Sequence, residues 1–143
     1  MNKKVKIILS VIILLALGIT ASIVIYNEIQ YNKSEYILYT TVDNHDVTLS
    51  VPKGSKFIGE QGLGGFKFKT RNTQEEVESF YKSYLDSLPT VIYKSGKRTA
   101  HYDESRNIVI CDLSFQTSKG ALFFVVECEC MIPGKPNSDW TLN

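Results

Sequence analysis

The sequence predicts an α+β fold: an N-terminal transmembrane helix followed by a mostly antiparallel sheet with one amphipathic helix packed on one face. Three observations lead to this prediction. Residues 7–26 form an uninterrupted apolar run, residues 73–88 contain a capped amphipathic pattern, and β-rich segments separated by short turns fill most of the remaining chain. With 43% hydrophobic and 22% charged residues, the composition is that of an ordinary globular protein.

The first apolar segment is expected to be an uncleaved membrane anchor. Residues 7–26 carry no charge, and at about 1.5 Å per residue they form a helix of about 30 Å, which matches a bilayer core. A cleaved signal peptide is the alternative, since Ala16 and Gly18 have the spacing of a cleavage site. Residues 23–25 are again apolar, so cleavage there would leave an apolar stub. No cysteine lies near the segment, and a lipid-modified start is not expected.

Charges beside this segment predict its orientation. Lys3, Lys4 and Lys6 precede it, whereas Lys33 is the one basic residue just after it. Because basic flanks remain in the cytoplasm, the N-terminus is expected inside the single-spanned cell membrane and the C-terminal domain outside it. The predicted parts of the chain are a cytoplasmic basic end, a transmembrane anchor, a polar stalk, one extracytoplasmic α+β domain and an irregular tail (residues 1–6, 7–26, 27–35, 36–132 and 133–143).

Strands are expected on both sides of the amphipathic helix. Residues 36–42 and 47–51 are β-rich runs separated by a turn-forming cluster, which predicts a hairpin. In the later runs, short turns make successive strands antiparallel neighbours. The further expected strands are residues 65–71, 90–94, 98–103, 107–115 and 121–131.

The amphipathic pattern predicts the helix of the outer domain. Thr73 and Glu76 have the spacing of a capping box. We expect the apolar stripe of this helix to pack against the sheet, with Phe80, Tyr84 and Leu88 in the core, rather than to line a pocket. The stripe consists of Val77, Phe80, Tyr81, Tyr84, Leu85 and Leu88.

Parts of this pattern resemble a group of small uncharacterised bacterial extracytoplasmic domains, some of them borne on lipoproteins. In that group a proline-glycine segment and a strand precede a helix with an E-E-V-x-x-F-Y core, and antiparallel strands follow. Here VPKGSKF, FKFKTRNTQEEVESFYKSYL and the strands after them have this arrangement, over residues 47–130. The resemblance implies the same fold and an extracytoplasmic location, and it carries no catalytic residue. A transmembrane helix stands here in place of the lipidated cysteine of the lipoprotein members.

The expected strand at residues 65–71 provides the candidate binding face. Its phenylalanines alternate with Lys67, Lys69 and Arg71, so one face is buried and the other is basic. Such a face can bind an anionic envelope polymer, lipid headgroups or an acidic envelope protein, although a merely solvated strand face has the same pattern. The formal net charge of +1 gives no reason to expect nucleic acid.

No set of residues predicts catalysis, a metal ion or a cofactor. The glycines of residues 59–65 lead into a strand and lack the Lys-Ser/Thr ending of a phosphate loop, so a flexible turn or bulge is expected. His101, Asp103 and Ser105 lie close in sequence, but their pattern is that of a solvated hairpin end. His45 belongs to a turn, and its separation from His101 does not match a metal-ligand spacing.

The three cysteines lie on the last two expected strands of the domain. Alternation places Cys128 and Cys130 on an apolar face, where thiols act as small buried hydrophobes and lack the cations that activate a redox thiol. A two-residue turn at residues 119–120 would set Cys111 opposite Cys128, and we hypothesise a disulfide between them. A four-residue loop would instead set Val109 opposite Cys128. Reduced buried thiols are the alternative to the bridge, and Cys130 stays free in both cases.

The outer domain is therefore expected to be a binding or interaction module without catalytic activity, anchored at the cell surface. Two alternatives stay open. The first is a small enzyme, either a thiol oxidoreductase or a hydrolase that uses the region of His101. The second is a regulatory or assembly subunit that acts through its transmembrane helix. A pocket with convergent amides and a titratable group would favour the enzyme, whereas an exposed apolar or basic patch without one would favour binding.

Overall fold

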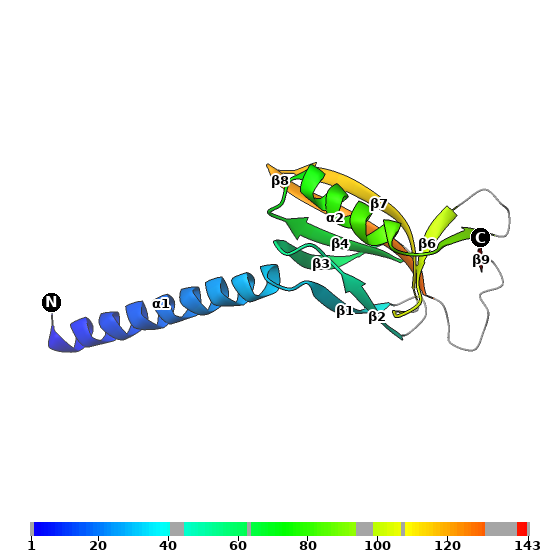
Figure 1. Cartoon of the computed structure of the whole chain (residues 1–143). Coiled ribbons are helices and arrows are strands. Elements are labelled where there is room, and N and C mark those ends of the chain that lie inside the picture. The colour runs from blue at the N-terminus through cyan, green and yellow to red at the C-terminus, as the bar shows by residue number, and fades with distance from the viewer. Residues whose placement is uncertain are drawn as a thin grey trace.

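Helix α1 (Lys3–Tyr31) projects from the rest of the protein, as Figure 1 shows. None of its residues is buried, and it is long and apolar enough to cross a membrane. The predicted polar stalk is largely part of this helix, because α1 continues to Tyr31 and the first strand begins at Glu35. The structure is a computed structural model that describes residues 2–40, 45–62, 64–93, 99–106, 108–130 and 140–142.

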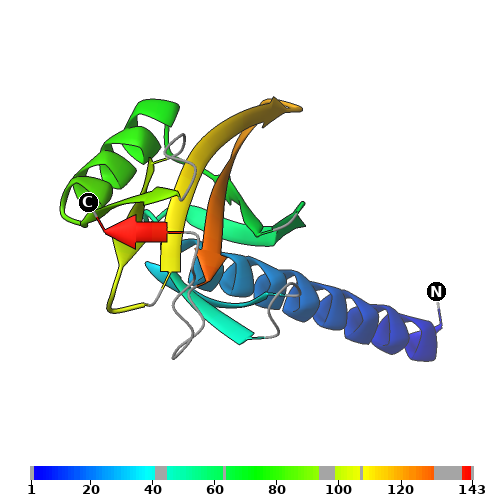
Figure 2. The ribbon, with the colours of Figure 1, turned by 90° about the vertical axis from the view of Figure 1, so that its right-hand side faces the viewer.

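The domain after α1 is built from two antiparallel sheets. Among the described residues, β1 and β2 form a two-stranded sheet, and the other strands form a seven-stranded sheet in the order β3-β4-β8-β7-β6-β5-β9. The larger sheet is strongly curved (Figures 1 and 2). The strands are β1 (Glu35–Thr40), β2 (His45–Ser50), β3 (Ser55–Gln61), β4 (Gly65–Thr70), β5 (Thr90–Tyr93), β6 (Thr99–Asp103), β7 (Ile108–Ser118), β8 (Ala121–Cys130) and β9 (Trp140–Leu142).

Helix α2 (Gln74–Asp86) connects the two halves of the larger sheet. It carries the chain from β4 towards the other side of the sheet, where β5 begins a meander that returns through β6 and β7 to β8. The meander closes on the first half when β8 pairs with β4, with Phe124 opposite Phe68. Each of these short connections joins antiparallel neighbours. The predicted α+β fold with one helix on the sheet is confirmed.

One difference lies in the tail, which the sequence predicts to be irregular. Residues 140–142 form strand β9 and pair with the free edge of β5, with Leu142 opposite Val91. A three-residue strand is too short to show the alternation that identifies strands in a sequence. Its pairing depends on an edge that only the folded sheet provides. The remainder of the predicted tail, residues 133–139 and 143, lies outside the described residues.

The core lies on one face of the larger sheet. Phe68 and Phe124 stack with their ring centroids 5.2 Å apart, and Tyr36 of β1 meets Phe68 edge to face at 5.6 Å. Tyr81 of α2 meets Phe124 at 5.9 Å from the helical side. Helix α2 and the β1–β2 hairpin therefore cover the same face of the sheet together, in one continuous apolar cluster.

The capping box of α2 is confirmed, but the centre of its apolar stripe is not where it was predicted. Val77 and Tyr81 are the fully buried residues, whereas Phe80, Tyr84 and Leu88 are only partly buried. The prediction that these three form the core is wrong. The reason is that the helix has a second neighbour besides the sheet, since the Tyr81 hydroxyl donates a hydrogen bond to the Ser50 carbonyl of β2 at 3.0 Å.

The β7–β8 turn is the two-residue turn, one of the two alternatives that the sequence left open, but the register changes further along the hairpin. Ser118 pairs with Ala121 across a two-residue turn, in which Lys119 and Gly120 have positive φ angles of 50° and 74°. A bulge then shifts the pairing between Ile110 and Asp112, so that Ile110 lies opposite Cys128. The predicted pairing of Cys111 with Cys128 is therefore wrong.

The bulge has a packing reason. It allows Leu113 and Phe115 on one side of it, and Ile108 and Ile110 on the other, to contact the same core. Without the extra residue, strand alternation would bring only one of these two pairs to that face. Cys111, the extra residue, packs instead in the smaller cluster formed by Val91, Ala100 and Val109.

We predict that Tyr81 is the dominant core contact of α2. Tyr81→Ala should lower the free energy of unfolding by about 3–5 kcal/mol, the usual cost of removing a large buried aromatic side chain. Glu78→Ala, at an exposed position on the same helix, should change it by less than about 0.5 kcal/mol. Urea unfolding of the detergent-solubilised protein, followed by near-ultraviolet circular dichroism, measures both. Equal losses in the two variants would contradict this assignment of the core.

Candidate functional site

An ion pair fixes the end of α1 to the domain. Both terminal nitrogens of Arg71, just after β4, donate to the carboxylate of Glu28, at 3.0 and 2.5 Å. The Arg71 guanidinium also lies 3.9 Å from the centroid of the Tyr31 ring. Beside it, the Lys56 ammonium on β3 donates to the side-chain oxygen of Asn27 at 2.6 Å. The last two turns of α1 are thus held by two strands of the larger sheet.

Backbone groups complete this junction. The Gly54 amide donates to the Tyr31 carbonyl at 2.7 Å, and the Tyr36 hydroxyl donates to the Gln30 carbonyl at the same distance. These carbonyls belong to the last turn of the helix, which has no following turn to satisfy them. Neutral and charged contacts together give α1 a defined direction relative to the domain. Residues 27–31 are therefore held against the domain and do not form a freely moving stalk.

The predicted basic residues do share one face. Lys67, Lys69 and Arg71 point away from the core, and Lys69 lies opposite Lys56 of β3. Their roles differ, however. Arg71 holds α1, whereas the Lys67 ammonium donates to Gln116 of β7 at 2.8 Å and lies 5.1 Å from the ring centroid of Phe123. Lys56 of β3, which the sequence suggested as a further member, belongs to the same face.

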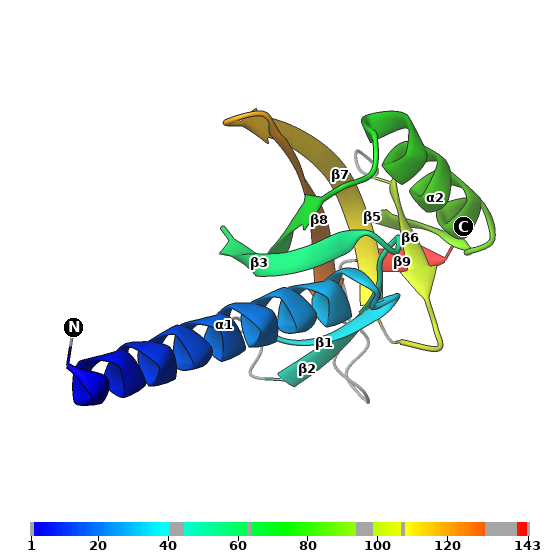
Figure 3. The same ribbon diagram turned by 90° about the vertical axis from the view of Figure 1, so that its left-hand side faces the viewer.

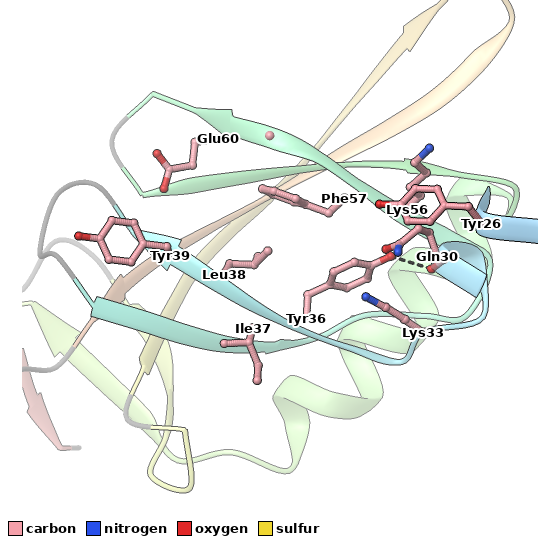
Figure 4. Close-up of a pocket in the computed structure, with 11 residues that line it drawn as sticks. Tyr26, Gln30, Lys33, Tyr36, Ile37, Leu38, Tyr39, Lys56, Phe57 and Glu60 are labelled. Carbon is pink, nitrogen blue, oxygen red and sulfur yellow. Dashed lines mark hydrogen bonds between the residues drawn. The ribbon is translucent and has the colours of Figure 1, made fainter. Parts of the chain in front are cut away.

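A groove lies between the edge strands β1 and β3, beside the end of α1. Its volume is about 560 Å³. Figure 4 shows Tyr36, Leu38 and Phe57 pointing into the space between the two strands, with Tyr39 and Glu60 at the end away from α1. Burial raises the pKa of Tyr36, so its hydroxyl remains a hydrogen-bond donor at neutral pH. The floor is aromatic and aliphatic, and polar groups lie at the ends.

Residues at the end of α1 and just after it form the other end of the groove. Tyr26 and Gln30 of α1 line it there together with Lys33, which follows the helix, and Lys56 of β3. The Lys33 ammonium lies 5.2 Å from the ring centroid of Tyr36, within range of a cation–π contact. Tyr26 is also the last residue of the predicted membrane span, so the groove opens next to the end of the span. The sequence did not reveal this groove, because its walls come from three separate elements.

Asp103 is the centre of a buried polar network, contrary to the predicted solvated hairpin end. The residue is 3% exposed, and its carboxylate accepts hydrogen bonds from the Tyr84 hydroxyl of α2, from Ser105 at 2.6 Å and from the Arg106 guanidinium at 2.9 Å. Arg106 also forms an ion pair with Glu35 of β1. The network therefore ties α2, β6 and β1 together.

Protonation equilibria in this network follow from its contacts. Burial opposes the ionisation of Asp103, but the hydrogen bonds from Ser105, Tyr84 and Arg106 outweigh it and lower the pKa of the carboxyl group. Burial and the Asp103 carboxylate raise the pKa of Tyr84. The Ser105 hydroxyl is used by the carboxylate, so Ser105 does not have the histidine partner of an activated nucleophile. An Asp with Ser two residues later and a backbone amide three residues later is a turn pattern that could have indicated this role.

We predict that the Asp103 carboxylate stabilises the fold and does not act in catalysis. Asp103→Asn should reduce the free energy of unfolding by about 1.5–3 kcal/mol at pH 7, since it weakens hydrogen bonds to a charged group. Because the folded pKa is lowered, the contribution is complete above the unfolded pKa of about 3.9 and is lost as the pH falls through the folded pKa. The difference from the native protein should therefore shrink below about pH 4.

Asp112→Asn is the matched control, because Asp112 is an exposed carboxylate on the next strand. It should unfold like the native protein at pH 7. Urea titrations at several pH values distinguish the two variants. A constant difference between Asp103→Asn and the native protein down to pH 2 would refute the ionised role of Asp103.

The glycine-rich segment lies between the paired strands β3 and β4, where a flexible turn or bulge was predicted. Gly59 follows a bulge in β3, and Gly62 and Gly64 have positive φ angles of 68° and 80°. The Gly64 carbonyl accepts the Cys128 amide at 2.9 Å, and a Cβ atom on Gly64 would lie 2.5 Å from the Cys128 carbonyl oxygen. The glycines serve tight backbone approach in the sheet. They do not form a phosphate loop.

The cysteines show no redox or metal arrangement among the described residues. Cys128 is buried in the main core, and Cys111 packs in the smaller cluster on the opposite face of the sheet. The structure does not join them by a disulfide. Searching the described residues finds no group of three His, Cys, Asp or Glu side chains that could hold a metal ion. The side chains of His45 and Cys130 lie outside the described residues.

We predict that Cys111 and Cys128 both react in thiol labelling of the denatured, unreduced protein. The bulge separates their side chains by the thickness of the sheet, and a disulfide needs Cβ atoms within about 4.5 Å. In the folded protein, labelling of the buried Cys128 should be slow. Peptide mapping assigns the labels. Protection of both residues after denaturation, reversed by a reductant, would support the bridge and contradict this register.

No family model, curated protein or solved structure matches this chain. The junction, the groove and the basic face are therefore the basis for a functional proposal.

Proposed function

We propose that the protein is a membrane-anchored extracytoplasmic binding module without catalytic activity, with its N-terminus in the cytoplasm. The length and apolar composition of α1 support the anchor. Lys3, Lys4 and Lys6 before the apolar segment support the orientation. Tyr26 and Tyr31 near the other end have the amphipathic character that favours a membrane interface.

The contacts of α1 favour an uncleaved anchor over a removed signal peptide. Ile23, Val24 and Ile25 follow the candidate cleavage positions and are exposed in the structure. A bilayer would cover these side chains, whereas cleavage before them would leave them in water. Immediately after them, Asn27 and Glu28 are bound to the domain. Cleavage before Ile23 would thus leave a short helical end with exposed apolar side chains, still joined to the domain through Asn27 and Glu28.

The groove beside the anchor carries the proposal of a binding role. Its volume of about 560 Å³ lies within the usual range of ligand sites, and it combines an apolar floor with polar groups at its ends. It lies between two strand edges, where an extended peptide or an apolar ligand can be accommodated. Lys33 and Lys56 at the α1 end favour a ligand with a negative group there.

The alternative enzyme classes find less support in the same geometry. A thiol oxidoreductase needs a second thiol or a cation that lowers the pKa of the first. Cys111 and Cys128 are separated by the sheet. A hydrolase needs a nucleophile beside a base, whereas the Ser105 hydroxyl is bound to the Asp103 carboxylate. Packing accounts for the positions of the two cysteines, and the hydrogen bond to Asp103 accounts for Ser105, so neither position requires a catalytic role.

Site-specific photo-crosslinking in intact cells tests the proposed function. With benzoylphenylalanine in place of Tyr39, a large aromatic residue at the rim of the groove, we expect a discrete protein adduct of the full-length chain. Protease added outside the cells should degrade this adduct while a cytoplasmic marker survives. The substitution keeps an aromatic ring at an exposed position, so the fold should tolerate it.

The matched control places the same residue at Lys82, which is exposed on α2 on another side of the domain. No corresponding adduct is expected there. The same adducts from both positions would argue against a ligand in the groove. A mature chain that begins near Ile23, or that is found in the medium, would contradict the proposal of an uncleaved anchor.

A further inference from the structure

The surface of the sheet opposite the core contains a group of cations next to α1. We call this surface the outward face; its members are Lys56 on β3, Lys67, Lys69 and Arg71 on and after β4, and Phe123 on β8. Cross-strand pairing brings Lys56 opposite Lys69, and Lys69 opposite Phe123. Lys67 reaches over the Phe123 ring. The group is therefore contiguous, with cations on either side of an aromatic side chain.

The acidic side chains near this surface are not mixed evenly with its cations. Glu28 is already paired with Arg71. Asp112 and Glu127 are cross-strand neighbours on β7 and β8, and Glu127 lies opposite Gly65 at the other end of β4. The positive charge is thus concentrated at the end of the outward face that lies beside α1.

The junction sets the depth of this group relative to a membrane. Asn27 and Glu28 lie one and two residues past Tyr26, which corresponds to about 1.5–3 Å along the helix axis. The headgroup layer extends about 5–7 Å beyond the hydrocarbon core. Lys56 and Arg71 bind these two residues directly, so a bilayer that ends its apolar core at Tyr26 has its headgroups at the level of Lys56 and Arg71.

The direction of α1 brings the rest of the outward face to the same side. Figures 2 and 3 show α2 on one side of the β7–β8 pair, and the N-terminal end of α1 on the other side. The outward face therefore looks towards the membrane in which α1 is embedded, while α2 looks away from it. Lys69 lies opposite Lys56 on that side, and Lys67 lies two residues further along β4.

We propose that the outward face rests on the anionic lipid headgroups of the membrane that α1 spans, with Lys67 and Lys69 as its main cations and Phe123 at the interface. This inference rests on the anchor in the proposed function and adds the surface that meets the bilayer. The occupant is a lipid surface because the short junction leaves the headgroups next to this face. Each lysine near such a surface favours the docked state by a factor of about five. Phe123 adds an apolar ring, one of the side chains that interfacial surfaces bury at the boundary between headgroups and acyl chains.

Nuclear magnetic resonance of the full chain in lipid nanodiscs tests this contact. Discs that contain phosphatidylglycerol and a small fraction of lipid with a gadolinium-chelating headgroup broaden amide signals close to the headgroups. The amides of Lys67, Lys69 and Phe123 should be broadened more than those of Glu78 and Lys82 on α2. The contrast should decrease in phosphatidylcholine discs and at high salt, because both weaken the electrostatic attraction.

The double variant Lys67→Gln/Lys69→Gln should lower the ratio of docked to undocked domain by about 25-fold, the product of two fivefold factors. Lys82→Gln, which removes an exposed cation on the other side of the domain, should leave the ratio unchanged. Equal broadening of the two sides, or broadening that does not depend on lipid charge, would overturn the proposal. If the signals of the outward face change only after an acidic protein or polymer is added, the face binds that partner and not the membrane. Because all these measurements use the anchored chain, they are independent of whether the anchor is cleaved in cells.

Discussion

Burial of the main core on one face of the curved sheet is the constraint on which the rest of the structure depends. Phe66, Phe68 and Phe124 project from neighbouring strands to that face, and α2 and the β1–β2 hairpin cover them side by side. Both covering elements lie on one side, so the end of α1 meets the opposite face of β3 and β4. Cations on that opposite face then stay outside the main core, where their desolvation cost is small.

The junction joins α1 and the domain into one oriented unit. A polar linker would leave the domain free to rotate relative to the helix. Here Glu28 and Asn27 are held by Arg71 and Lys56, and the carbonyls of the last helical turn are satisfied by Gly54 and Tyr36. The same contacts place the groove beside the end of the apolar segment of α1. Orientation and site position are therefore consequences of one set of interactions.

Two irregular features let a regular sheet accept its covering elements. The bulge at Cys111 brings both halves of β7 into the main core and leaves Cys111 on the other face. The network around Asp103 satisfies polar groups where α2, β6 and β1 meet. If an apolar side chain replaced Asp103, the Arg106 guanidinium would lose this carboxylate partner inside the fold. Both features therefore specify how the elements are arranged, and neither supplies a reactive group.

The sequence by itself determined the elements that local signals define: the apolar helix, the capping box at Thr73 and Glu76, and the β-rich runs with a turn before Ala121. Periodicity, caps and turn residues act within a few positions, so they are legible in one chain. Alternation also placed Lys67, Lys69 and Arg71 on one face. Only the tertiary structure decided that Tyr81 and Val77, and not Phe80, Tyr84 and Leu88, are the buried centre of α2.

The same holds for the burial of Asp103, the register at Cys128, the pairing of β9 and the contact of Arg71 with α1. Each depends on a neighbour far away in the sequence: a second covering element, a free sheet edge or a helix end. A bulge of one residue reverses every later side chain on a strand, and neither period nor composition reveals it. Local patterns therefore specified which segments exist, whereas packing between distant segments decided which of their faces are buried and which groups meet.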